Sequence, residues 1–144
     1  MDRDNFKDGK YYSSEAIKRY LLILKNIYKV DYNKFNTNYE NHTGTYFIQI
    51  YQILKFIKNS TIKNQQLYVN ILRAQFTKEE LEFLFYHCLG SIGSQKFKPL
   101  LEDFEFFEHL ALNPNIEKNL TKYNKSIYGK KEAILAKYDE LKEH

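Results

Sequence analysis

Hydrophobic side chains recur at helical spacing along most of this chain. After Ser13 and Ser14, residues 14–30 place apolar side chains on one helical face: Ile17, Tyr20, Leu21, Leu24, Ile27 and Tyr28. A second face of this kind ends near Asn59: Tyr46, Phe47, Ile50, Ile53, Leu54 and Ile57. Residues 31–44 lack the period and are rich in asparagine. The pattern therefore predicts two helices joined by a loop over 31–44.

Two further helices are predicted in the middle of the chain. The third runs from about Asn64 to Gln75, with an apolar arc of Leu67, Tyr68, Ile71 and Leu72. A capping box follows, since Thr77 can accept a hydrogen bond from the Glu80 amide while the Glu80 carboxylate reaches back. The fourth helix begins at this box and is expected to end near Leu89.

The C-terminal third is punctuated by glycine and proline. Gly90 and Gly93 mark the exit from the fourth helix, and Ser94 to Glu108 is expected to hold one or two short helices interrupted near Pro99. Asn113 and Pro114 open a further turn or helix. The last helix places apolar side chains on one stripe: Ile134, Leu135, Tyr138 and Leu141.

These elements predict an all-α, compact single-domain helical bundle of about six to seven helices, because no alternating strand pattern stands beside them. The 144 residues can bury one sizeable core, and two prolines and five glycines mark no linker. We therefore expect one domain over residues 1–144. The charged segment 1–12 is expected to be a flexible or loosely ordered N-terminus.

Composition excludes several classes of protein. Cys88 is the single cysteine, so an intramolecular disulfide is excluded and a reducing, cytoplasmic location is expected. No segment is long and apolar enough to span a membrane, and no signal peptide is recognisable. The net charge is +4, but residues 61–110 hold five basic and seven acidic side chains. Nucleic acid is therefore a disfavoured partner.

Polar residues of the third helix are candidates for a functional surface. Gln75 falls within the apolar arc and is expected to be partly buried, where its amide would fix a neighbouring backbone turn. Arg73 lies on the edge of the arc, and its planar head suits either a structural salt bridge or an external carboxylate or phosphate. Because Arg73 lies on the helix edge rather than in the apolar arc, we expect Arg73→Ala to leave the fold intact and abolish function.

The fourth helix is apolar nearly all round, because Phe83, Tyr86 and His87 lie opposite its main apolar arc. Such a helix is either central in the bundle or buries its second face against a partner or a second copy of the chain. Phe83 and Tyr86 are the candidate interface, and Tyr86 and His87 complete the candidate functional surface. His87 beside Cys88 lacks the spacing of a metal or nucleophile site.

No catalytic motif is recognisable, so no catalytic residue, cofactor or metal site is assigned. Three classes of function stay open. The first is a protein-recognition module, which is compatible with a homodimer. The second is a helical nuclease or nucleotide-acting toxin whose site combines Arg73, Tyr86, His87 and Glu105. The third is a nucleic-acid-binding regulator, whose affinity would fall steeply with salt.

Residues 46–58, 68–89 and 96–110 resemble the phage abortive infection proteins sometimes called AbiC-like. The most specific piece runs from Ile71 to Gln75 and continues into the capped helix with Glu80-Leu81 and Leu84-Phe85-Tyr86. The chain departs from the family pattern at Ile48 and His87, where members often carry arginine and asparagine. The family-like core is thus residues 46–110.

The resemblance implies a role in bacterial defence against bacteriophage, exerted on a protein partner or a phage component. Many longer members resemble membrane proteins with an N-terminal hairpin ahead of the helical region. This chain shows no such hairpin in its sequence.

Overall fold

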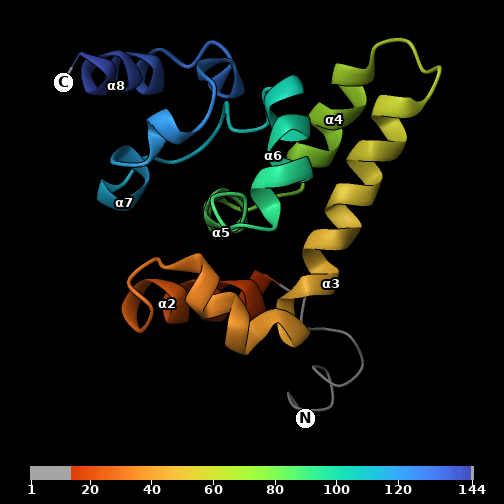
Figure 1. Ribbon diagram of the computed structural model, residues 1–144. Helices are drawn as coiled ribbons and strands as arrows, with labels where there is room; N and C mark the ends of the chain where they lie inside the picture. Colours follow the sequence, from red (N-terminus) through yellow and green to blue (C-terminus); the bar gives the residue numbers. More distant parts are fainter. Residues whose placement is uncertain (1–13, 144) are drawn as a thin grey trace.

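The computed structural model describes residues 14–143, which contain seven α-helices and no strand (Figure 1). The predicted all-α class is therefore confirmed. The elements are α2 Ser14–Asn26, α3 Tyr32–Asn59, α4 Gln65–Arg73, α5 Lys78–His87, α6 Gly93–Asp103, α7 Pro114–Glu117 and α8 Glu132–Lys142, with 3₁₀ turns Leu120–Lys122 and Lys125–Tyr128. The flexibility expected for residues 1–12 concerns a segment outside the described residues.

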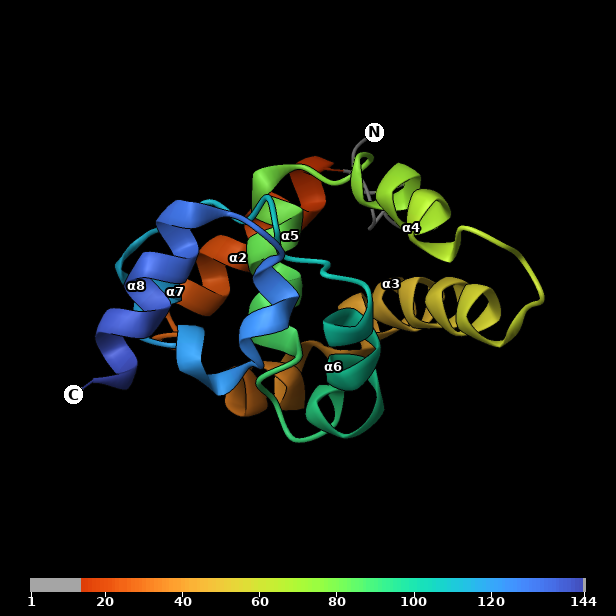
Figure 2. The same cartoon turned by 90° about the horizontal axis from the view of Figure 1, so that it is seen from above.

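Helix α5 is the centre of the fold. Figures 1 and 2 show it between α2 on one side and α6 on the other, with the segments around α7 and α8 alongside. It packs against α2 and α3, and its side chains from Phe83 to Tyr86 are completely buried. Tyr123 adds a hydrogen bond from its hydroxyl to the Phe85 carbonyl, at 2.6 Å. The interpretation of this helix as a central core element is confirmed.

Helix α3 begins at Tyr32, so the loop predicted over residues 31–44 is wrong. Asp31 caps the helix by accepting from the Lys34 amide at 3.2 Å. Tyr32 and Phe35 are buried, and the Phe35 ring stacks on Tyr39 with centroids 4.8 Å apart. This aromatic packing outweighs the weak helix propensity of the asparagines, which point outward.

The interruption predicted at Pro99 is also wrong, because α6 is continuous through this residue. Proline removes the hydrogen bond that the Gln95 carbonyl would accept. Pro99 and Gln95 both lie on the exposed side of α6, where water can satisfy that carbonyl, while Phe97, Leu100 and Leu101 are buried on the other side. The buried face therefore holds the helix together across the proline.

The first helix, predicted over 14–30, ends earlier, at Asn26, and Lys29 and Val30 have positive φ angles. Several other predicted boundaries agree with the structure. Helix α3 ends at Asn59, α7 begins at Pro114 behind an Asn113 cap, and both hydrogen bonds of the Thr77–Glu80 capping box are present. Glu80 also accepts a hydrogen bond from the Tyr46 hydroxyl at 3.0 Å, so the cap of α5 is tied to α3. None of the described helices is long and apolar enough to cross a membrane.

Candidate functional site

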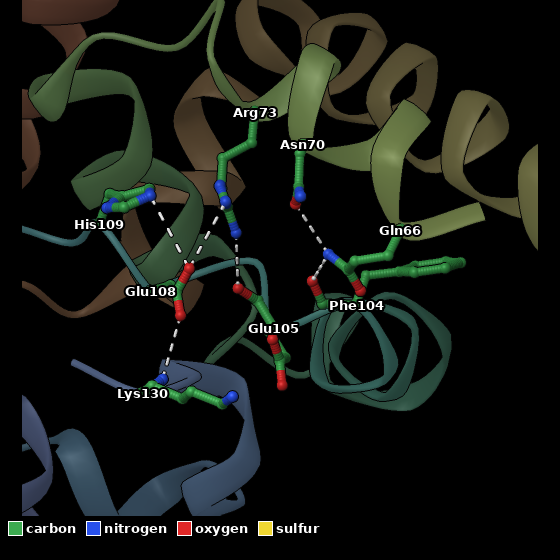
Figure 3. A network of polar contacts seen from close by, with 8 residues as sticks. All are labelled: Gln66, Asn70, Arg73, Phe104, Glu105, Glu108, His109 and Lys130. Carbon is green, nitrogen blue, oxygen red and sulfur yellow. Dashed lines mark hydrogen bonds and ion pairs between the residues drawn. The ribbon is translucent and has the colours of Figure 1, made fainter. Parts of the chain in front are cut away.

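The polar edge of α4 holds the sharp turn that follows α6 (Figure 3). Arg73 is 7% exposed, and its Nη1 donates to the Glu105 carbonyl at 3.0 Å. Glu105 has a φ of 52°, a left-handed conformation that is uncommon for a residue other than glycine. The charge-assisted bond from Arg73 therefore stabilises a strained turn.

Two neighbours of Arg73 act on the same turn. Gln66 donates from Nε2 to the Phe104 carbonyl at 2.7 Å and to Asn70 Oδ1 at 2.9 Å. Figure 3 shows Gln66, Asn70 and Arg73 aligned along α4 above residues 104 and 105. One edge of α4 thus supplies the donors that the turn's carbonyls require.

Glu108 extends this network to the C-terminal part of the chain. Its Oε1 lies 3.7 Å from Arg73 Nη2, and its Oε2 accepts from the Lys130 amide at 3.0 Å. His109 is a third neighbour, with Nε2 3.8 Å from Oε1. The carboxylate therefore bridges α4 and the segment before α8, which is a structural role.

Arg73 consequently makes the structural pairing that the sequence left open, and its side chain is buried instead of projecting into solvent. The expectation that Arg73→Ala leaves the fold intact is corrected, because Arg73 is itself buried and the substitution would take the side-chain donor from the part-buried Glu105 carbonyl and the cation from Glu108.

Gln75 is exposed, so the expectation that it is partly buried is wrong. The phase of α4 explains the error, because its buried residues are Val69 and Arg73. The predicted apolar arc instead faces solvent: Leu67, Tyr68 and Ile71 are 54%, 49% and 54% exposed. Gln75 makes only a long contact, from Nε2 to the Ile71 carbonyl at 3.5 Å.

Phe83 and Tyr86 do not lie on a surface of the chain. Both are completely buried, and the Tyr86 hydroxyl donates to Glu82 Oε2 at 2.7 Å. Burial and the neighbouring carboxylate raise the pKa of this phenol. A surface or interface role for these two side chains is therefore corrected, since both belong to the core around α5.

His87 is half-buried at the C-terminal end of α5. Its Nδ1 lies 2.8 Å from the Tyr32 hydroxyl, and its ring stacks on Phe47 with centroids 3.9 Å apart. Desolvation lowers its pKa to about 3, so the imidazole is neutral at physiological pH. Burial raises the pKa of the adjacent Cys88 thiol, which keeps it protonated and unreactive.

The four residues of the alternative catalytic site do not form one group, because Arg73 bonds to the Glu105 carbonyl while Tyr86 and His87 have other partners. Arg73 precedes α5 and His87 ends it, and a helix of ten residues is about 15 Å long. The Tyr86 hydroxyl, one residue before His87 in the chain, donates its hydrogen bond to the Glu82 carboxylate. Within residues 14–143, no three histidine, cysteine, aspartate or glutamate side chains are grouped to hold a metal ion.

The exposed apolar side of the α3–α4 pair was missed by the sequence interpretation. Figure 2 shows the C-terminal half of α3 beside α4 at the edge of the molecule away from α7 and α8. Beyond Ile48, which is also exposed, five apolar side chains of these helices are 45% to 71% exposed: Ile53, Phe56, Leu67, Tyr68 and Ile71. We name these five residues the hairpin face. The apolar period gave no signal of this exposure, since it is the same for an exposed arc and a buried one.

A family model described as "Putative phage abortive infection protein" matches residues 38–114. This match covers more than half of the 144 residues. The chain belongs to this family. The matched region contains the family-like core predicted over 46–110, and it includes the hairpin face, α5, α6 and the turn held by Arg73.

Neither the curated proteins nor the solved structures contain a significant match to this chain.

Proposed function

We propose that this chain is a helical module of a bacterial abortive-infection defence protein that works in the cytoplasm by recognising another protein. The family supports the role in phage abortive infection. The observation that supports protein recognition is the hairpin face, which leaves apolar side chains from two packed helices in contact with water.

The exposure of this face follows from how α4 is held. Val69 packs into the core, and Arg73 with Gln66 is committed to the turn at residues 104 and 105. Leu67 and Ile71, one helical turn apart, must then point away from the core. Leu67 and Ile71 are therefore neighbouring exposed apolar side chains on one helix face, and contiguous exposed apolar surface is typical of interaction sites.

Charge indicates the chemistry of the partner. Lys55, Lys58 and Lys63 lie on or beside the two helices of the hairpin face, and residues 41–78 contribute no carboxylate. Lys58 is partly compensated by Asp103, at 3.3 Å. The fitting partner is therefore a protein with an apolar strip bordered by acidic residues. Two copies of this basic surface would repel each other, which disfavours a homodimer through it.

The test is plaque formation by a panel of phages on bacteria expressing the chain or its L67D/I71D variant. The matched control is L22D/I27D, which places two aspartates at comparably exposed apolar positions of α2 and its C-terminal end. We expect protection to be lost with L67D/I71D and kept with the control. Loss in both variants, or in neither, would contradict recognition through this face.

A binding measurement separates the remaining classes. Anisotropy of labelled single- and double-stranded DNA and RNA in 50 mM and 200 mM salt is expected to show no tight binding. Affinity that falls steeply with salt would favour the nucleic-acid alternative instead. Nuclease activity lost with His87→Gln would favour the enzyme alternative.

A further inference from the structure

A cavity of about 360 Å³ lies between α3 and α6, at the C-terminal end of α5. Its walls are mainly apolar, with Phe47, Ile48 and Tyr51 from α3 facing Ile92 and Phe97. The volume falls in the lower part of the range of small-molecule sites in proteins. This cavity is separate from the hairpin face and from the Arg73 network.

His87 presents one unsatisfied nitrogen to this cavity. Its Nδ1 faces the Tyr32 hydroxyl, its ring lies flat on Phe47, and Phe97 approaches its other side with centroids 5.7 Å apart. Its Nε2 has no hydrogen-bond partner among the described residues. Among these residues, every polar side-chain atom that is fully buried does have a partner. Nε2 is therefore accessible to solvent, and His87 is one of the residues that line the cavity, so this nitrogen is the group offered to a ligand there.

Gly44 keeps the α3 wall of the cavity open. A Cβ at this position would meet only Glu40 Cγ, at 3.7 Å, so packing does not require glycine here. Glycine in a helix interior costs about 1 kcal/mol relative to alanine. Gly93, on the opposite wall, is required by packing, since a Cβ there would lie 2.6 Å from the His87 carbonyl. The space beside Gly44 is thus available to a ligand.

The electrostatics of the cavity favour an uncharged ligand. Glu40 and Lys96 are on its rim and carry opposite charges. The imidazole at its floor is neutral at physiological pH, because burial disfavours its charged form. An ion would lose hydration against the apolar walls, and Glu40 and Lys96 together present no net charge that would favour one sign of ion.

We propose that this cavity is a binding site for a small, uncharged aromatic or heteroaromatic ring that carries one hydrogen-bonding group. The ring would contact the aromatic walls, and its polar group would bond to His87 Nε2. This inference does not rest on the proposed function, because it concerns a different surface and needs no protein partner.

The test uses phenol as the probe and the ring nitrogens of ¹⁵N-labelled histidine as the readout. The full chain is titrated at pH 7, and the His87 signal is identified by its absence in His87→Gln. We expect a saturable shift of the Nε2 resonance in the millimolar range, as is usual for ligands of this size. Toluene, which lacks the hydroxyl, and benzoate, which is charged, should each bind at least threefold more weakly.

Cavity-filling variants decide whether the shift reports this site. Gly44→Leu should abolish saturation, while Gln52→Leu, an exposed position of the same helix outside the cavity, should preserve it. Ile92→Trp also narrows the cavity, from an exposed position at its rim. It replaces Gly44→Leu as the filled variant if Gly44→Leu fails to fold. A shift that persists in the folded filled variants, or no saturable shift in the native chain, would overturn the proposal.

Discussion

At the scale of single residues, Arg73 shows that a polar side chain on a helix edge can be a core component. Removing it leaves the Glu105 carbonyl without its side-chain donor and takes the arginine cation from Glu108, which keeps the Lys130 amide. We expect Arg73→Ala to lower the free energy of unfolding by about 2–4 kcal/mol. Urea denaturation followed by circular dichroism measures this loss. Gln75→Ala, at the exposed neighbour, should change it by less than about 0.5 kcal/mol, and equal effects would refute a structural Arg73.

His87 predicts a pH dependence of stability. Its pKa is lowered to about 3 in the folded chain from an ordinary value of 6.5, so between these values only the unfolded chain binds the proton. Stability is therefore lost as pH falls through this window, by roughly 1.5 kcal/mol between pH 6.5 and 5.0. The groups around the imidazole are the Tyr32 hydroxyl, the buried Cys88 thiol, Glu40 and Lys96.

His87→Gln provides the comparison for this prediction. The variant cannot take up a proton at this position, so its stability should fall less over the same range. Urea denaturation of both proteins at pH 6.5 and 5.0 measures the difference. Parallel losses in the two proteins would show that other groups cause the acid sensitivity.

At the scale of elements, α6 tolerates Pro99 because its exposed side can be hydrated and its buried side is well packed. Replacing this proline with alanine restores an amide that can donate to the Gln95 carbonyl. We expect Pro99→Ala to raise the free energy of unfolding by about 1 kcal/mol, after allowing for the greater freedom of the unfolded chain. Thermal and urea denaturation measure the gain. A loss of stability would mean that proline fixes the geometry of α6.

Helices α3 and α4 show what an apolar pattern leaves undetermined. The period identified α4 as a helix, but the pattern could not tell that Val69 and Arg73 face inward while Leu67, Tyr68 and Ile71 face water. For α3, the aromatic residues at 32, 35 and 39 are helically spaced, but asparagines between them concealed the pattern. Both errors arise because tertiary packing outweighs local propensity and average hydrophobicity.

At the scale of the whole molecule, Gly129 and Glu108 join the C-terminal segment to the rest of the fold. Gly129 has a φ of 57°, and a Cβ there would lie 2.3 Å from Glu108 Oε2. Gly129→Ala should therefore destabilise the chain by about 2–4 kcal/mol, through backbone strain and displacement of the carboxylate.

A double-mutant cycle tests this connection. Because Gly129→Ala displaces the partner of Arg73, the losses in Gly129→Ala and Arg73→Ala should not add, and the interaction energy should be about 0.5–3 kcal/mol. Urea denaturation of the two single variants and the double variant supplies the values. Strict additivity would show that Glu108 does not couple the two regions.

The candidate sites were only partly predictable from the sequence. Arg73 and His87 stood out as polar residues in apolar surroundings, and the structure gives each a specific role. Four of the five residues of the hairpin face, all but Phe56, were placed on predicted apolar arcs, because an exposed apolar arc and a buried one have the same period. The cavity could not be predicted, since Gly44, His87 and Phe97 meet only when three helices pack together.

The sequence by itself determined the all-α class, most helix boundaries, the capping box and the family, because each depends on residues close together in the chain. Tertiary structure alone decided which helical faces are buried, which carbonyls Arg73 and Gln66 satisfy, and where a cavity remains. These properties depend on contacts between distant segments, such as Arg73 with Glu105. Local periodicity records that a side chain is apolar or polar, but not which neighbour the fold will place against it.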